Sequence, residues 1–64
     1  MIKLNGENCE ISNITVQNLL AEKCYDQKKV AVEINGEIVP KSKYANHVLH
    51  DGDSVEIVCF VGGG

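Results

Sequence analysis

The chain has 64 residues, of which 44% are hydrophobic and 23% charged, the composition of one small folded domain. It is too short to hold both a core and a conventional active-site cleft. Its net charge of −3 and six scattered lysines, without any arginine, argue against a nucleic-acid partner and favour basic proteins. No apolar run is long enough for a membrane span, and no signal-peptide pattern precedes the first expected strand. We expect a single cytoplasmic domain over residues 1–64.

An N-terminal hairpin is expected at the start of the chain. Residues 1–4 alternate between apolar and polar side chains, and Asn5-Gly6 is a typical two-residue hairpin turn. A second short strand should then cover about residues 8–11.

A helix is expected from Val16 to Cys24 or Tyr25. Thr15 stands at the N-cap, where its hydroxyl can accept a hydrogen bond from a backbone N–H of the first turn. The apolar residues recur at the spacing of one helical face, which predicts a helix that covers one side of a sheet. These residues are Val16, Leu19, Leu20 and Cys24.

A second hairpin follows a polar connection. Residues 30–34 alternate as a strand, Asn35-Gly36 is again a hairpin turn, and the returning strand reaches Val39. Because Pro40 has no N–H to donate, we expect this strand to stop there, near the edge of the sheet.

The segment before the last strand lacks clean periodicity. We expect a short helical turn over about residues 42–45 and Leu49 packed under the sheet. Residues 50–53, His-Asp-Gly-Asp, are turn formers that lead into the final strand.

The last strand is the most apolar part of the chain. Six of the seven residues 55–61 are apolar, which is typical of a central strand buried on both faces. A single helix covers only one face, however, and Glu56 marks the other, so Val58 and Phe60 should be exposed there as a docking patch. The alternative is that residues 41–49 fold over them. The covered face should carry Val55, Ile57 and Cys59.

These elements predict an α+β fold. The last strand is best placed centrally and parallel to the first, because parallel neighbours need a long connection and the chain supplies one. This is the β-grasp arrangement, a mixed sheet of about four to five strands with one helix on one face.

The chain ends in Val61-Gly62-Gly63-Gly64. Glycine lacks Cβ, so a partner can thread such a segment through a slot too narrow for side chains and reach the carboxylate of Gly64. We expect residues 61–64 to form a flexible tail, with Val61 joining Val58 and Phe60 in docking. The alternative is a tail that only improves solubility.

The order of these motifs resembles the ubiquitin-like sulfur carriers of the ThiS/MoaD family, most closely the carriers of thiamin biosynthesis. The resemblance covers the full chain, with Cys59 and the additional Gly62 as departures. The matching segments are Leu4-Asn5-Gly6, Thr15-Val16 with Leu19-Leu20, V-E-I-N-G-E-I-V-P from Val32 to Pro40, Asp51-Gly52-Asp53 and the terminal Gly63-Gly64.

The resemblance implies that the Gly64 carboxylate is adenylated by an E1-like, ThiF-like enzyme that uses ATP, with Gly62 and Gly63 threaded into that partner. Sulfur from a donor such as a cysteine desulfurase then leaves a thiocarboxylate, which a ThiG-like thiazole synthase receives. The carrier itself is then no enzyme and holds no cofactor.

Two other functions remain open from the sequence. The small subunit of a molybdopterin synthase resembles this carrier in fold, tail and activation but donates sulfur to a pterin. A ubiquitin-like modifier would instead be amide-linked to target proteins through Gly64. A redox protein is disfavoured because the chain lacks a C-x-x-C motif.

The histidines and aspartates near the final turn suggest no reaction centre. His47 and His50 lack the neighbouring ligands of a metal site, so we expect none. Asp51 and Asp53 flank a glycine and are expected to stabilise the turn.

The three cysteines are expected to be free thiols. Cys24 and Cys59 should be small core residues. Cys9 is the least constrained, and a persulfide relay there is a secondary hypothesis.

Overall fold

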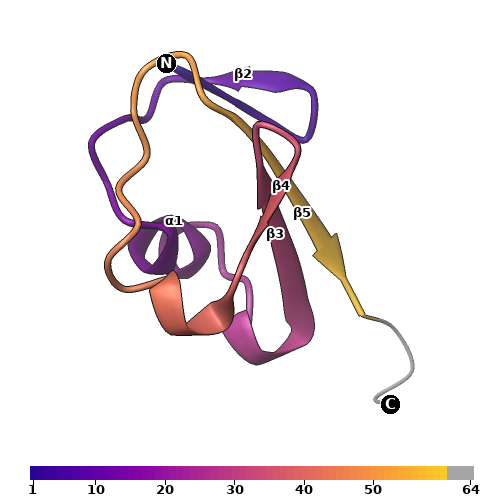
Figure 1. The fold of residues 1–64 in the computed structure, drawn as a ribbon. Helices are drawn as coiled ribbons and strands as arrows, with labels where there is room; N and C mark the ends of the chain where they lie inside the picture. Colours follow the sequence, from indigo (N-terminus) through magenta and orange to yellow (C-terminus); the bar gives the residue numbers. More distant parts are fainter. Residues whose placement is uncertain (61–64) are drawn as a thin grey trace.

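The computed structural model describes residues 1–60. Within that range one α-helix packs on one face of a five-stranded sheet (Figure 1). In chain order the elements are β1 Ile2–Leu4, β2 Glu7–Cys9, α1 Val16–Glu22, the 3₁₀ turn η1 Gln27–Lys29, β3 Val30–Ile34, β4 Glu37–Val39, the 3₁₀ turn η2 Lys41–Lys43 and β5 Ser54–Cys59. The strand order is β2-β1-β5-β3-β4, which confirms the predicted β-grasp arrangement.

Strand β5 lies at the centre of the sheet, as predicted. It pairs in parallel with β1 at Ser54 and Val55, and antiparallel with the whole of β3. Asn5 extends the short parallel pairing, since its N–H donates to the Val55 carbonyl and its Oδ1 accepts from the Ile57 N–H, both at 2.8 Å. The last strand is therefore hydrogen-bonded on both sides as far as Ile57 and to β3 alone beyond it.

Both hairpin turns have the expected geometry. Asn5 and Gly6 have φ values of 51° and 85°, and Asn35 and Gly36 have 54° and 85°, the left-handed pairs of type I′ turns. Strand β2 ends at Cys9, earlier than predicted. The Ile11 N–H donates to the Cys9 carbonyl at 2.8 Å, a three-residue turn that bends the chain away from the sheet.

The core lies between the sheet and α1. Strand β5 contributes only Val55 and Ile57 to it, whereas Val58 is 57% exposed. The prediction that this strand is buried on both faces is therefore wrong, because a single helix covers one face only. The predicted exposure of Val58 is confirmed. The full core consists of Ile2, Val16, Leu19, Leu20, Val30, Val32, Ile34, Val39, Tyr44, Leu49, Val55 and Ile57.

The predicted N-cap of α1 is confirmed, since the Asn18 N–H donates to Thr15 Oγ1 at 3.1 Å. The helix ends at Glu22, before the predicted Cys24 or Tyr25. Cys24 has a φ of 63°, and its N–H donates to the Ala21 carbonyl, while the Tyr25 N–H donates to the Leu20 carbonyl. These two bonds form a Schellman motif. Within residues 1–60 no helix has the length and apolar character needed to cross a bilayer.

Cys24 occupies the position in this motif that glycine usually takes. A side chain in the left-handed region costs about 1–2 kcal/mol, partly offset by the greater freedom of glycine in the unfolded chain. We expect Cys24→Gly to raise the free energy of unfolding by about 0.5–1 kcal/mol, measured by urea denaturation under reducing conditions. Cys24→Ala keeps the penalty and should show no such gain. An equal gain in both variants would assign the effect to the thiol instead.

The predicted burial of the cysteines is wrong for two residues. Cys24 is exposed because it lies beyond the end of α1, in the left-handed cap. Cys59 is also exposed: β1 flanks β5 only near Ser54, so no strand lies beside Cys59 on that side. Cys9, expected to be the least constrained, is partly buried and packs against the core.

The segment between β4 and β5 closes one end of the core. Its 3₁₀ turn covers Lys41–Lys43, slightly earlier than the predicted turn at residues 42–45. Leu49 is fully buried, as predicted, and Tyr44 joins the core although no pattern in its segment indicated burial. Because Val58 remains exposed, the alternative in which this segment covers it is wrong.

The final turn is fastened to the second hairpin through Asp53. Its carboxylate accepts from the His50 N–H at 2.9 Å and from the Asn35 side-chain amide at 3.1 Å. The hydrogen bond from His50 is the main reason that the pKa of Asp53 lies below its usual value. The predicted role of Asp53 in stabilising the turn is confirmed. The same hydrogen bonds hold in place the residue immediately before β5.

Candidate functional site

The described chain ends one residue beyond β5 (Figure 1). Phe60 is the last described residue, and its N–H donates to the Lys29 carbonyl at 2.8 Å. Its side chain is 58% exposed, as predicted. The predictions for Val61 and for Gly62, Gly63 and Gly64 fall outside the described residues and stay predictions.

The sheet face opposite α1 has no covering layer within residues 1–60, and we call it the open face. Strand alternation assigns its residues, because their neighbours along each strand are the buried ones. Ile38 is 70% exposed and Val58 57%. With Phe60 at its edge, this surface has the exposed apolar side chains of a docking site. The open face includes Ala31, Glu33, Ile38, Ser54, Glu56 and Val58, with Lys3 of β1 beside Ser54.

Lys41 lies beside the end of the described chain. Its Nζ donates to the carbonyls of Gln27 at 3.1 Å and Val30 at 2.7 Å. The same atom lies 5.7 Å from the ring centroid of Tyr44 and 5.8 Å from that of Phe60, within the range of cation–π attraction. Lys41 was not predicted as a functional residue, because nothing in its polar segment distinguishes it from the other lysines.

We expect Lys41→Met to lower the free energy of unfolding by about 1–3 kcal/mol, because two hydrogen bonds from a charged group are lost. Urea denaturation at neutral pH measures the change. Lys43→Met, on the same 3₁₀ turn, removes the same charge and should change stability by less than about 0.5 kcal/mol. Equal losses in both variants would show that the contacts of Lys41 are not the cause.

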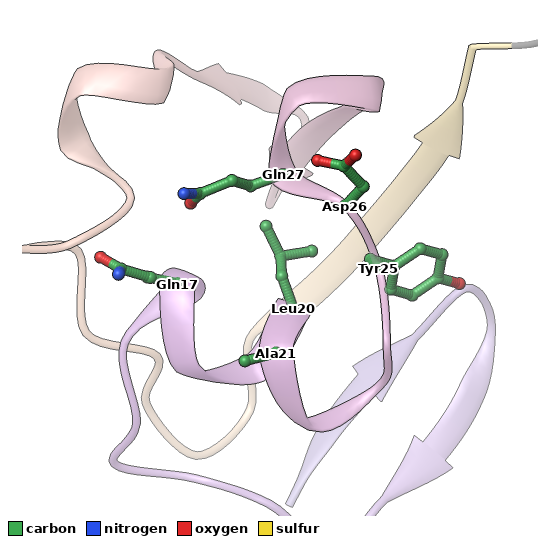
Figure 2. Close-up of a pocket in the computed structure, with 6 residues that line it drawn as sticks. All are labelled: Gln17, Leu20, Ala21, Tyr25, Asp26 and Gln27. Carbon is green, nitrogen blue, oxygen red and sulfur yellow. The ribbon is translucent and has the colours of Figure 1, made fainter.

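A hollow of about 290 Å³ lies between α1 and η1. Figure 2 shows the Leu20 side chain between the two segments, with the carboxamides of Gln17 and Gln27 directed to the same side. Leu20 is 1% exposed and belongs to the core. The hollow therefore follows from the Schellman ending of α1 and brings together no reactive groups.

The structure does not assemble the histidines and aspartates of the final turn into a reaction centre. His50 lies in the turn closed by Asp53, and the Asp51 carboxylate contacts the N-terminal amine of Met1. The His47 carbonyl accepts the N–H of Val16 at the start of α1. Among residues 1–60, no three potential metal-ligating side chains cluster.

The fold defines the class of protein. A mixed sheet with a central β5 and one helix on one face is the β-grasp, or ubiquitin-like, architecture. The family model described as "ThiS family" matches residues 2–64. The chain belongs to the ThiS family.

Individual relatives agree with this assignment. Sulfur carrier protein ThiS of Bacillus subtilis is 44% identical over 66 residues, and the match covers 100% of each chain. The crystal structure of thiamine biosynthesis protein ThiS from Geobacter metallireducens superimposes with a TM-score of 0.77 at 33% identity, covering 98% of this chain and 97% of that one. The chain is also 55% identical over 62 residues to the thiazole synthase of Paramagnetospirillum magneticum; this match covers 95% of the chain but only 19% of that protein.

Proposed function

We propose that this chain is a sulfur carrier protein of thiamin biosynthesis, with the sulfur held as a thiocarboxylate at Gly64. The observation that carries the proposal is the family match, which extends through residue 64. The central position of β5 supports it, because a strand held on both sides gives the tail a rigid base. The open face supplies a surface for the enzymes that act on the tail.

The chemistry requires activation of Gly64 by an E1-like, ThiF-like adenylyltransferase. A carboxylate is a poor electrophile, so one of its oxygens first attacks the α-phosphorus of ATP and pyrophosphate leaves. A persulfide sulfur from a donor such as a cysteine desulfurase then attacks the acyl carbon, AMP departs and an acyl disulfide forms. A thiol next attacks the donor's sulfur atom in that S–S bond, which leaves the thiocarboxylate on Gly64 and a disulfide on the donor. The adenylate survives only where water is excluded, and a narrow channel in the partner that admits Gly62 and Gly63 provides that protection.

The acceptor of the sulfur is a ThiG-like thiazole synthase. The similarity to part of a protein named thiazole synthase supports this choice, because two activities carried on one chain commonly serve the same reaction sequence. Docking would involve Val58, Phe60 and Val61, beside the exit of the tail.

Catalysis then belongs to the partners, and this chain acts as their protein substrate. ATP is bound by the activating enzyme, so the carrier needs no cofactor or metal of its own. We place the exchange in the cytoplasm, where ATP is available for adenylation and a reducing environment keeps the thiocarboxylate and the free cysteines from oxidation.

The intact mass of the protein isolated from cells tests the proposal. The expected result is a population in which one terminal oxygen is replaced by sulfur, and which disappears when the adenylyltransferase gene is deleted. Ladders of conjugated target proteins would instead show a ubiquitin-like modifier.

The choice of pathway needs a separate experiment. Deletion of this gene should impose a requirement for thiamin or its thiazole precursor, and re-expression of the chain should remove that requirement. Loss of molybdenum-enzyme activity with normal thiamin synthesis would identify the small subunit of a molybdopterin synthase and contradict the thiazole assignment.

A further inference from the structure

Two glutamates are directly opposed in register at the centre of the open face. Glu33 of β3 and Glu56 of β5 are direct partners in the antiparallel register. Cross-strand partners have Cβ atoms about 4.5–5.5 Å apart, and like charges placed in this way destabilise a sheet.

No ion pair within residues 1–60 involves Glu33 or Glu56. The ion pair found among residues 1–60 joins the N-terminal amine to the Asp51 carboxylate. The cation nearest in register is Lys3, which lies opposite Ser54 and diagonal to Glu56, and its ammonium forms no ion pair with either glutamate. Two acidic residues therefore lie opposite each other in register at the middle of the sheet.

Apolar side chains flank the two carboxylates. Ile38 is the partner of Glu33 on its other side, in β4, and it is 70% exposed. Val58 lies two residues beyond Glu56, opposite Ala31. A polar contact surrounded by apolar surface is the arrangement found at the centre of interfaces, where exclusion of water strengthens the contact.

We propose that the open face binds a partner surface that presents an arginine, received by Glu33 and Glu56 together, with apolar side chains against Ile38 and Val58. The inference rests on the proposed function, in which the partner is the activating enzyme. The planar guanidinium has five N–H donors and can span two carboxylates, whereas lysine offers a single point of charge.

Charge complementarity favours an arginine at the two glutamates over a calcium ion or a second copy of this chain. Calcium needs six to eight oxygen ligands, and no cluster of three acidic or histidine side chains occurs within residues 1–60. A second copy of this chain would bring two further carboxylates against the first two. An arginine would offset the repulsion between Glu33 and Glu56 and could bind both carboxylates.

The test combines binding and stability. Glu33→Gln and Glu56→Gln should each raise the Kd for the ThiF-like adenylyltransferase of the same organism by about tenfold or more, and high salt should reduce the difference from the wild type. The same variants should shift the urea midpoint of the isolated carrier to higher concentration, because the repulsion is relieved. Loss of affinity together with a gain in stability cannot come from misfolding.

Glu22→Gln is the matched control. It removes the same charge from the exposed surface of α1, on the other layer of the fold, and should leave the Kd unchanged. An arginine-to-glutamate variant of the enzyme that fails to bind the wild type but binds Glu56→Lys would identify the partner residue.

Three results overturn the inference. They are wild-type affinity in both glutamine variants, an equal loss of affinity in Glu22→Gln, and sedimentation of the wild type as a dimer that Glu56→Lys disrupts. Each would leave the proposed function standing as long as the enzyme adenylates the wild-type chain. Absence of adenylation of the wild type would instead overturn the proposed function.

Discussion

A Gly63→Trp chain is expected to fold normally and to form essentially no thiocarboxylate. The core of the described chain consists of residues between Ile2 and Ile57, and glycine has no side chain to contribute to a core, so we expect the fold to survive this change. An indole cannot enter a slot that admits bare backbone, and a displacement of about 1 Å at a reacting centre can cost about 100-fold in rate. We expect a loss of at least that size, measured by intact mass after incubation with adenylyltransferase, ATP and sulfur donor.

Two matched variants separate the effect of side-chain size at position 63 from the effect of tail length. Gly63→Ala adds a single methyl group and should retain part of the activity. Deletion of Gly64 leaves a chain that still ends in two glycines but is shorter by about 3.3–3.6 Å, so its loss of activity measures reach alone. Normal modification of Gly63→Trp would contradict the threading of the tail through a narrow slot.

The sequence predicted most of the fold because its signals are local. The two Asn-Gly turns define the hairpins, Thr15 defines the start of α1, and both assignments depend on backbone geometry within a few residues. The central position of β5 followed from the need of a parallel pair for a long connection. These rules left few arrangements for a chain of this length.

The errors occurred where tertiary context decides burial. A cysteine at i+4 from Leu20 continues the apolar stripe of α1, yet the helix has already ended and Cys24 caps it in the left-handed region. Cys59 has the alternation of a buried residue, but the short β1 leaves one side of it without a neighbour. Periodicity shows where a side chain points, not whether a neighbouring element is long enough to cover it.

The site was predicted in part. Alternation around Glu56 correctly gave the exposure of Val58 and Phe60, because a single helix covers a single face. The pairing of Glu56 with Glu33 depends on the register of β3 against β5, which no local motif specifies. The contacts of Lys41 with Gln27 and Val30 likewise appear only when η2 is placed beside η1.

Phe60→Asp is expected to weaken docking to the adenylyltransferase without unfolding the carrier. The ring is 58% exposed, and the hydrogen bond from the Phe60 N–H to the Lys29 carbonyl belongs to the backbone, so the sheet loses little. An exposed aromatic side chain beside a threaded tail is typical of an interface hot spot, for which truncation costs about 2 kcal/mol or more. We expect the KM of the carrier in pyrophosphate exchange to rise by about 30-fold or more.

The conservative variant and a distant control decide the interpretation. Phe60→Leu keeps an apolar contact and should recover much of the affinity, whereas Val48→Asp, a partly exposed position paired with Thr15 at the start of α1, should leave the KM unchanged. If Phe60→Asp loses its circular dichroism signal, the ring contributes to the core through Lys41 and Tyr44. If instead the variant folds and its KM is unchanged, recognition depends on the tail alone and the sheet beside it takes no part.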